Sequence, residues 1–313
     1  MTTSKFPIKA PVIVLVGPTA IGKTALSLEI ADRFSCEIIS LDSMQIYRHM
    51  DIGTAKVSTQ EREHTPHHLI DIVNPDEHYD ASDYVRDALE AIVGIHQRKK
   101  IPLVTGGTGL YLRALIEGLF KSGASFPELR EELHRRLETE GASKLHEELL
   151  SKDRITAQKI HKNDTHRLIR ALEIYHGTGK SWSDHIAGHA REKGKIRFEH
   201  LIRLGLTCER ELLYRRINER TSLMLRQGLR EEVLKLLAQG YRRDLKSMQS
   251  IGYRHMAEHL LDGTPIEKTE ELLARDTRRY AKRQYTWFKK MNIEWFEAAS
   301  YQKINTRIQN FLG

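Results

Sequence analysis

The sequence predicts an α/β protein in which a parallel sheet is flanked by helices and interrupted by an inserted all-helical subdomain. A continuous aliphatic run at residues 12–16 precedes a glycine-rich turn and a helix, and strand and helix signals then alternate up to residue 104. Strand signals disappear between residues 119 and 195 and return after residue 200. With 313 residues, 40% of them hydrophobic, the chain is long enough to bury one large core and a smaller one.

The first elements follow one another in a regular order. Residues 12–16 predict a strand buried on both faces, because their side chains are all β-branched or aliphatic. Residues 25–34 predict a helix, since Leu26, Ile30 and Phe34 recur four apart on one face. Further strands are expected at residues 36–41, 68–73 and 101–104, with an amphipathic helix at residues 84–98. Ligands of such sheets bind at the carboxyl ends of the strands.

The rest of the chain defines two expected domains. Residues 127–140, 142–150 and 164–175 predict helices separated by Gly, Asp and Asn. A strand at residues 200–206, helices at 209–228 and 231–238, and a last strand at 293–296 return the chain to the sheet. We therefore expect a core domain formed by residues 1–118 and 196–313, and a helical insertion at residues 119–195.

The turn after the first strand fits the phosphate-loop pattern G-x-x-x-x-G-K-[ST] and lies between a buried strand and a helix, as that motif requires. It consists of Gly17, Pro18, Thr19, Ala20, Ile21, Gly22, Lys23 and Thr24. Glycines let backbone N–H groups converge on phosphate oxygens, the lysine adds a charge, and Thr24 is placed to hold Mg²⁺. The alternative is an ordinary strand-to-helix turn. The motif favours a P-loop NTPase-like fold, but it does not distinguish a nucleoside triphosphate from another pyrophosphate.

Two further segments are expected at the same edge of the sheet. Asp42 ends the second strand, where a carboxylate suits a base or a metal ligand; the alternative is that it only caps the turn at Ser43. The run Gly106-Gly-Thr-Gly109 follows the fourth strand and supplies a flexible backbone and the Thr108 hydroxyl. The segment 51–56, Asp-Ile-Gly-Thr-Ala-Lys, indicates no mechanism by its spacing alone.

The net charge of +8 is unevenly distributed. Residues 1–195 carry 27 Lys and Arg against 27 Asp and Glu, whereas residues 196–313 carry 23 against 15. Arg275, Arg279 and Arg283 recur four apart, with Arg278 and Lys282 beside them, which predicts a basic helical stripe facing a polyanion. A solvated basic face is the alternative. Tyr280, Tyr285, Trp287 and Phe288 interleave with the stripe and could either stack on RNA bases or pack in the core.

Composition excludes several classes of protein. The longest apolar run near the N-terminus is too short for a membrane span and lacks a signal-peptide cleavage pattern, so we expect a cytoplasmic protein without membrane contact. The two cysteines, Cys36 and Cys208, are far apart and indicate neither a disulfide framework nor a structural zinc site.

The motifs in their order resemble the bacterial tRNA dimethylallyltransferase family. The resemblance rests on GPTAIGKT at 17–24, ISLDSMQIYRHMDIGTAK at 39–56, PHHLID at 66–71, GGTGLY at 106–111, HKNDTHRLIRALEIYHGTGK at 161–180, IGYRHM at 251–256 and AKRQYTWFKK at 281–290. It covers residues 11–296, and the sequence lacks the Cys/His zinc finger of some eukaryotic relatives.

The resemblance implies a reaction and a partner. The family transfers a dimethylallyl group from dimethylallyl diphosphate to N6 of adenosine 37 in tRNAs reading codons that begin with U, without consuming ATP. The phosphate loop would then hold the diphosphate, with Mg²⁺ near Thr24. Asp42 would be the base that removes a proton from the adenine amino group, Thr108 would act beside it, and Arg216 would neutralise the diphosphate. Arg215 is adjacent, so the assignment between the two arginines stays open. A monomer is expected from the resemblance.

The resemblance also implies a tRNA-contacting surface. The base is extruded from its stack, and contacts to the base and its neighbours fall to Asp42, Ser43, Met44, Gln45 and Thr108. Contacts from the insertion fall to Arg130, His166, Arg167, Leu168, Ile169 and Arg170. Contacts near the C-terminus fall to Gln249, Gly252, Tyr253 and Arg254 and to the stripe of Arg275, Arg278, Arg279, Lys282 and Arg283.

Three other functions share part of the pattern. A small-molecule or nucleoside kinase would use the same loop and acid, but it requires a triphosphate and leaves the basic C-terminal third unexplained. An enzyme that prenylates free adenylate would not need a tRNA-sized surface. An RNA-binding NTPase would release phosphate without transferring a prenyl group.

Overall fold

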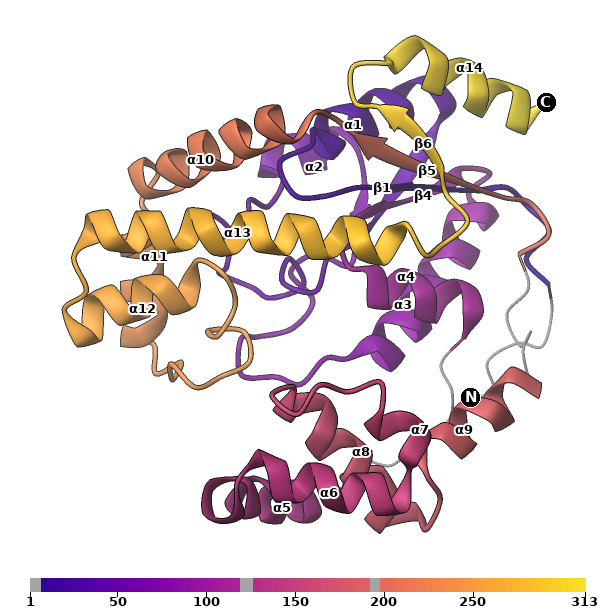
Figure 1. The fold of residues 1–313 in the computed structure, drawn as a ribbon. Coiled ribbons are helices and arrows are strands. Elements are labelled where there is room, and N and C mark those ends of the chain that lie inside the picture. Colours follow the sequence, from indigo (N-terminus) through magenta and orange to yellow (C-terminus); the bar gives the residue numbers. More distant parts are fainter. Residues whose placement is uncertain (1–6, 119–125, 192–197) are drawn as a thin grey trace. The chain divides into compact units, whose positions relative to one another are not determined.

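The computed structural model describes residues 7–118, 126–191 and 198–313 (Figure 1). The chain divides into two compact units, one formed by Met1–Ile116 with Ile196–Gly313 and the other by Glu117–Lys195. The domain boundaries expected after residues 118 and 195 border on or fall within the segments outside the described residues.

The first unit is built on a six-stranded sheet in the order β3-β2-β4-β1-β5-β6, and all its strand pairs are parallel. The strands are β1 (Val12–Val16), β2 (Cys36–Leu41), β3 (His67–His68), β4 (Ile101–Gly106), β5 (Leu201–Thr207) and β6 (Glu294–Glu297). Every residue of β1 and β2 is buried. The parallel sheet and the helices beside it confirm the predicted fold class.

The strand expected at residues 68–73 is wrong in its extent. Only His67–His68 pair with β2, and a single bridge joins Tyr47 to Val73. Leu69 and Asp71 adopt left-handed backbone angles, with φ of 62° and 56°. Such angles cannot continue a strand. The aliphatic residues in this run pack against the core from an irregular loop instead.

Alternate side chains of the sheet pack into two hydrophobic clusters, one on each face of the sheet. Ile13 and Leu15 pack with α1 (Lys23–Phe34), α10 (Arg210–Arg226) and α14 (Tyr301–Leu312). Val12, Val14 and Val16 belong to the cluster with α3 (Ala81–Gln97), α4 (Gly109–Glu117), α11 (Leu229–Ala238) and α12 (Tyr253–Asp262). The period of two in a strand makes this three-layer arrangement possible.

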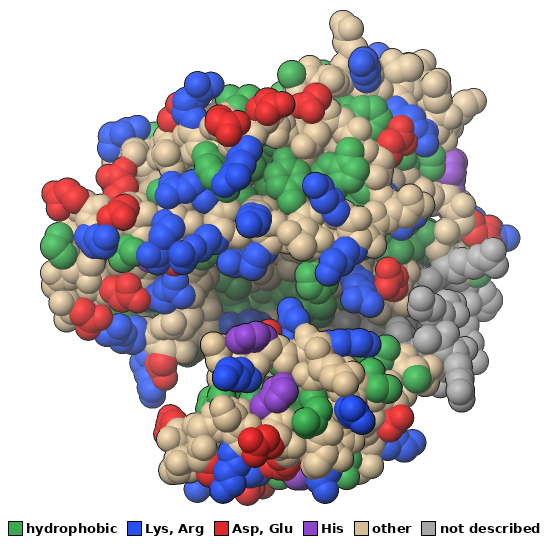
Figure 2. Space-filling model, viewed as in Figure 1, with side chains coloured by type: hydrophobic (Ala, Val, Ile, Leu, Met, Phe, Trp, Pro, Cys, Tyr) green, Lys and Arg blue, Asp and Glu red, His purple; other side chains and the backbone are tan. Residues whose placement is uncertain are grey.

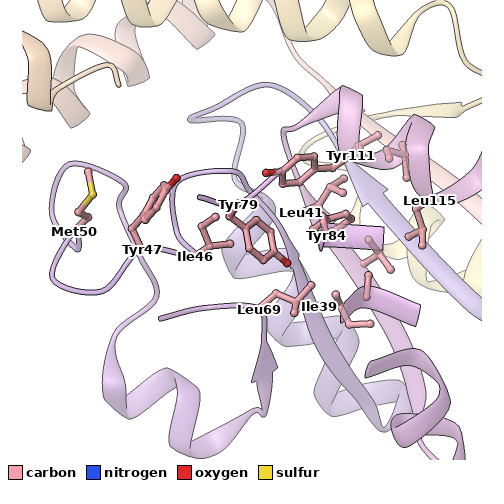
Figure 3. Close-up of a cluster of buried hydrophobic side chains, with 14 of the residues drawn as sticks. Ile39, Leu41, Ile46, Tyr47, Met50, Leu69, Tyr79, Tyr84, Tyr111 and Leu115 are labelled. Atoms are coloured by element: carbon pink, nitrogen blue, oxygen red, sulfur yellow. The ribbon is translucent and has the colours of Figure 1, made fainter. Parts of the chain in front are cut away.

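Aromatic side chains fill much of the second cluster (Figure 3). Tyr84 of α3 stacks on Tyr111 of α4, with ring centroids 4.4 Å apart. Ile46, Tyr47 and Met50, which follow β2, are also fully buried in this cluster. The loop after β2 is therefore fixed to the core rather than free in solvent.

The remaining helices of the first unit are α2 (Thr59–His64) and α13 (Ile266–Phe288). α13 runs beside α10 and α12 (Figure 1) and turns Ala281, Gln284 and Phe288 inward. Among the residues described, no helix is long and apolar enough to cross a membrane.

The second unit is entirely helical where it is described. It contains α5 (Pro127–Glu140), α6 (Ala142–Lys152), α7 (Arg154–Ala157), α8 (Thr165–Thr178) and α9 (Trp182–Arg191). Its own core includes Leu133, Leu145, Leu149, Leu168 and Leu172. Because this core is separate from those of the sheet, the unit has an independent source of hydrophobic stabilisation.

Candidate active site

The phosphate loop leaves a helix N-terminus open to a ligand. α1 begins at Lys23, directly after Gly22, whose φ of 104° is accessible to glycine alone at low cost. Within the described part of the chain, no side chain caps this end of the helix. The first backbone N–H groups of a helix have no intrahelical partner and carry the positive end of its dipole. The loop is therefore suited to bind an anion.

Lys23 reinforces that site. Its Nζ donates hydrogen bonds to the carbonyl oxygens of Gly17 and Pro18, at 3.0 and 2.8 Å. Burial, together with the nearby charge of Arg220, lowers the pKa of Lys23 to about 7, although Asp42 acts in the opposite direction. A diphosphate placed here would stabilise the charged ammonium, so the electrostatics of the empty site favour binding of an anion.

Asp42 lies in the same cavity as Lys23. The cavity has a volume of about 110 Å³ and is bordered by Thr24, Gln45, Thr105 and Tyr280. Asp42 Oδ1 accepts hydrogen bonds from the backbone N–H groups of Met44, at 2.8 Å, and Gln45, at 3.3 Å. The carboxylate thus caps the turn after β2 and also borders the cavity, and its role as a base or metal ligand stays a prediction.

The Gly-rich loop after β4 closes the other side. Thr108 Oγ1 accepts a hydrogen bond from Ser43 N–H at 3.1 Å, which joins this loop to the turn at Asp42. Thr105, in β4 three residues before Thr108, has a buried Oγ1 with no hydrogen-bond partner among the residues described. A buried hydroxyl without a partner is costly unless a ligand satisfies it, so Thr105 is a candidate substrate contact that the motifs did not indicate.

Gln284 of α13 joins both loops. Thr19 N–H donates to its Oε1 at 2.9 Å, and its Nε2 donates to the Gly107 carbonyl oxygen at 3.0 Å. A Cβ atom on Gly107 would lie 2.1 Å from that Nε2, so only glycine fits. Gln284 was missed by the sequence reasoning because it comes 265 residues after Thr19 and carries no motif of its own.

Two arginines of α10 reach this region, and Arg215 does not. Arg216 Nη1 donates to the Ile21 carbonyl oxygen of the phosphate loop at 3.3 Å, whereas Arg215 is exposed. Arg220, one helical turn further on, borders the cavity, and burial lowers its pKa. No carboxylate pairs with Arg220 within the described residues. The spacing of four from Arg216 was the signal that could have pointed to it.

The arrangement resembles that of known proteins. A family model described as IPP transferase matches residues 45–291. The chain belongs to the IPP transferase family. It is 56% identical to a tRNA dimethylallyltransferase of Desulfotalea psychrophila over 97% of this chain and 96% of that protein. It is 39% identical to the crystal structure of the full-length tRNA isopentenylpyrophosphate transferase of Bacillus halodurans, which covers 97% of both chains with a TM-score of 0.71. A eukaryotic dimethylallyltransferase acting on tRNA is 31% identical, with 96% of this chain and 77% of that chain covered and a TM-score of 0.77.

The predicted basic stripe of this IPP transferase lies on α13, where Lys and Arg side chains gather (Figure 2). Arg279, Lys282 and Arg283 are exposed, and Arg275 and Arg278 are half-buried. The aromatic residues beside them turn inward: Phe288 is fully buried, and Tyr285 donates a hydrogen bond to Thr207. Packing therefore accounts for Tyr285 and Phe288, whereas Tyr280 borders the cavity, and the stripe presents charge.

The candidate contacts near α12 divide in the same way. Gln249 is exposed and Arg254 is half-buried, with its Nη2 3.0 Å from Asp276. Tyr253 is fully buried, and its hydroxyl donates a hydrogen bond to Glu232. The side chain of Tyr253 is thus not available to RNA in this structure, and Gly252 is buried beside it.

In the helical unit of the IPP transferase, two of the arginines predicted to contact tRNA form ion pairs with the same carboxylate. Glu173 is fully buried and lies 2.8 Å from Arg130 and 3.0 Å from Arg170. It also accepts the backbone N–H of Phe126 at 3.0 Å. His166 and Arg167 are exposed, whereas Leu168 and Ile169 are buried in the core of this unit. Those last two side chains support the surface and do not form it.

Proposed function

We propose that this IPP transferase moves the dimethylallyl group of dimethylallyl diphosphate to N6 of adenosine 37 in tRNAs that read codons beginning with U. The products would be N6-(dimethylallyl)adenosine and diphosphate. One observation carries the proposal: a cavity of about 110 Å³ combines two half-buried cations, Lys23 and Arg220, with one carboxylate, Asp42. The cations can neutralise the charge of the diphosphate leaving group, and the carboxylate can accept the proton of the adenine amino group.

Breaking the allylic carbon–oxygen bond leaves its electron pair on diphosphate. The helix N-terminus at Lys23 and the guanidinium groups of Arg216 and Arg220 are placed to neutralise that developing charge. Stabilisation of charge that grows only in the transition state raises the rate rather than merely tightening binding.

The acceptor nitrogen needs a base. The lone pair of the adenine amino group is delocalised into the ring, so the group is a poor nucleophile until its proton leaves. Asp42 takes that proton as the N6–carbon bond forms. Thr108, hydrogen-bonded to the backbone of Ser43 beside Asp42, holds the turn that carries the base.

Mg²⁺ fits the oxygen donors of this site. The hydroxyl of Thr24 borders the cavity and would hold the ion, and Mg²⁺ in proteins typically keeps several waters and binds a few protein oxygens together with substrate phosphates. When bound, the ion would offset charge on diphosphate.

The tRNA is proposed to lie on the α13 stripe and on exposed residues of the helical unit, with the protein acting as a monomer. Exposed arginines such as Arg279 and Arg167 would contact phosphates, which position the RNA without reading its sequence. Extruding the adenine costs a few kcal/mol of unstacking, which these contacts must offset.

The test is incubation of purified protein with Mg²⁺, labelled dimethylallyl diphosphate and unmodified tRNA carrying adenosine 37, without ATP, followed by nucleoside analysis. Label on N6 of that adenosine is expected. Absence of transfer, combined with ATP-dependent phosphorylation of a small acceptor, would instead support a kinase. A free-adenylate prenyltransferase would leave tRNA unlabelled and would label adenylate in a parallel reaction that contains adenylate in place of tRNA.

A further inference from the structure

The segment 51–56 gained no role from the sequence or from the reaction above, yet it forms part of the cavity wall. Thr54 and Ala55 border the cavity together with Gln45. Gln45 Nε2 points to the carbonyl oxygens of Thr54, at 3.3 Å, and Ala55, at 3.4 Å. Because carbonyl oxygens only accept hydrogen bonds, the amide nitrogen of Gln45 must face them.

This contact fixes which atom of Gln45 the ligand meets. With Nε2 turned to the loop, Oε1 lies toward Ser40, whose hydroxyl donates to it at 3.2 Å. Ser40 also borders the cavity. A carbonyl oxygen has two lone pairs, so Oε1 keeps one for a donor such as an amino group of the acceptor base. The position of residues 54 and 55 therefore sets the orientation of Gln45.

Glu232 of α11 holds the other end of the segment. Its Oε2 accepts the backbone N–H groups of Asp51, at 2.9 Å, and Ile52, at 2.8 Å, and its Oε1 accepts that of Gly53 at 3.2 Å. Three consecutive N–H groups that converge on one carboxylate form an anion-binding turn closed by the protein's own side chain.

Tyr253 completes this contact from α12. Its hydroxyl donates to Glu232 Oε1 at 2.5 Å, and its ring packs on Gly53 so closely that an added Cβ would lie 2.4 Å from a ring atom. Burial raises the pKa of Tyr253, so the hydroxyl stays a donor. The side chain of Glu232 is thus held from two sides.

Lys56 fixes the segment where it leaves the cavity. Its Nζ is almost fully buried and donates to the Tyr47 carbonyl oxygen at 2.8 Å, to Asp51 at 2.5 Å and to Asp71 at 2.7 Å. The carbonyl oxygens of residues 54 and 55 therefore lie between two anchored points.

We infer that Glu232, held by Tyr253, is a positioning residue for the acceptor base: it fixes the backbone of residues 51–55 and through it the amide of Gln45. The inference rests on the proposed function, because it assigns the acceptor side of that reaction. Glu232 does not border the cavity of the phosphate loop, so its effect on the donor is indirect at most.

The test compares wild type with Glu232→Gln, Gln45→Ala and the double variant. The amide of Glu232→Gln keeps one acceptor oxygen and presents an NH₂ group to backbone donors, so it disrupts the turn with little change of volume. We expect kcat/KM for tRNA to fall about tenfold, as small misplacements near a site do, while KM for dimethylallyl diphosphate stays within about twofold of wild type. The matched control is Glu231→Gln, an exposed neighbour on α11 whose ion pair is with Arg230 alone among described residues.

The route through Gln45 is tested by coupling. If Glu232 acts through Gln45, adding Glu232→Gln to Gln45→Ala should lower kcat/KM for tRNA by no more than about twofold further. Fully additive losses, or a Glu232→Gln enzyme equal to Glu231→Gln, would overturn the inference. Failure of the wild type to prenylate tRNA would instead count against the proposed function.

A second variant covers loss of folding. Tyr253→Phe keeps the ring on Gly53 and removes one hydrogen bond to Glu232. Its melting temperature should remain close to that of wild type. Its kcat/KM for tRNA should fall about threefold, in line with loss of one weak positioning contact. In the Gln45→Ala background, adding Tyr253→Phe should leave kcat/KM for tRNA unchanged. Unchanged kinetics in Tyr253→Phe, alongside an unfolded Glu232→Gln, would reduce Glu232 to a structural residue and overturn the inference.

Discussion

Asp42 has a structural role that the hydrogen bonds show and a chemical role that we propose. Oδ1 accepts two backbone N–H groups, and this contact holds the turn that carries Ser43 to Gln45. No hydrogen bond engages Oδ2 within the described residues, and in the proposed reaction this oxygen would take up the proton of the adenine amino group. An alanine substitution would remove both roles at once, so it would not isolate the base.

Asp42→Asn separates them. The amide oxygen can still accept from Met44 and Gln45, whereas the side chain no longer takes up a proton. Single-turnover transfer should fall by about 10²-fold or more, the range of general-base catalysis, with tRNA affinity little changed. Near-normal transfer with normal tRNA binding would remove Asp42 as the base.

The lowered pKa of Lys23 leads us to expect that anion binding is coupled to proton uptake. Its pKa is lowered to about 7 in the empty site, mainly by burial, and a bound diphosphate raises that pKa again. Above pH 7 the free enzyme must therefore gain a proton on binding, and affinity for inorganic diphosphate should fall by up to about tenfold per pH unit until the pKa of the complex is reached. Calorimetry in buffers of different ionisation enthalpy measures the uptake.

Lys23→Arg supplies the control for that experiment, because arginine stays charged across this range. Titration of the ligand itself affects both proteins equally. The variant should bind more weakly but lose the additional pH dependence; identical pH profiles in the two proteins would contradict the assignment to Lys23.

At the scale of elements, α13 has two faces with different tasks. Its inward face provides Gln284 to the phosphate loop and Tyr280 to the cavity. Its outward face carries the exposed Arg279, Lys282 and Arg283. RNA bound outside would thus contact the same rigid helix that completes the donor site inside, which aligns the two substrates without a flexible connection.

Arg279→Glu tests the outward face. Charge reversal should weaken tRNA binding and reduce the slope of log affinity against log salt by about one or more. Binding of dimethylallyl diphosphate should stay unchanged. Lys303→Glu, an equal charge reversal at an exposed residue of α14, is the matched control. Equal tRNA affinity of both variants at low salt would show that the stripe is only a solvated face.

At the scale of the whole molecule, the sequence predicted the elements whose signal is local. The aliphatic runs of β1 and β2 and the 3.6-residue periodicity of α3 and α8 correspond to observed elements within a few residues. The strand predicted at residues 68–73 was wrong because residues with left-handed backbone angles interrupt this run, and the aliphatic composition of the run does not reveal them. The helices α7 and α9 were not expected; α7 spans four residues and is too short to show a period.

The site was predictable where its residues are contiguous in a motif, as from Gly17 to Thr24. Gln284 and Thr105 were missed because no motif marks them, and Arg220 was missed although it lies one helical turn after Arg216. The resemblance implied tRNA contacts at Leu168 and Tyr253, and the side chains of both residues are buried in this structure. A motif around a binding site therefore contains buried residues that support the surface as well as residues that contact the ligand.

Hydrogen exchange offers a prediction for the whole chain. Every residue that borders the cavity belongs to the first unit. Inorganic diphosphate with Mg²⁺ should therefore slow exchange in residues 17–24, the loop after β2 and α13, and leave α5, α6 and α8 unchanged. Protection that spreads into those three helices would contradict a donor site confined to the first unit.

The hydrogen bonds of Gln284 to Thr19 and Gly107 can form only late in synthesis of the chain. The phosphate loop is among the first segments translated, but its closing contact lies 265 residues later. At about 5–20 residues per second, the ribosome takes on the order of tens of seconds to cover that distance. During this interval the sheet edge exists without its last support, so a nascent or prematurely terminated chain would hold the donor poorly, and full binding capacity would mark a finished polypeptide.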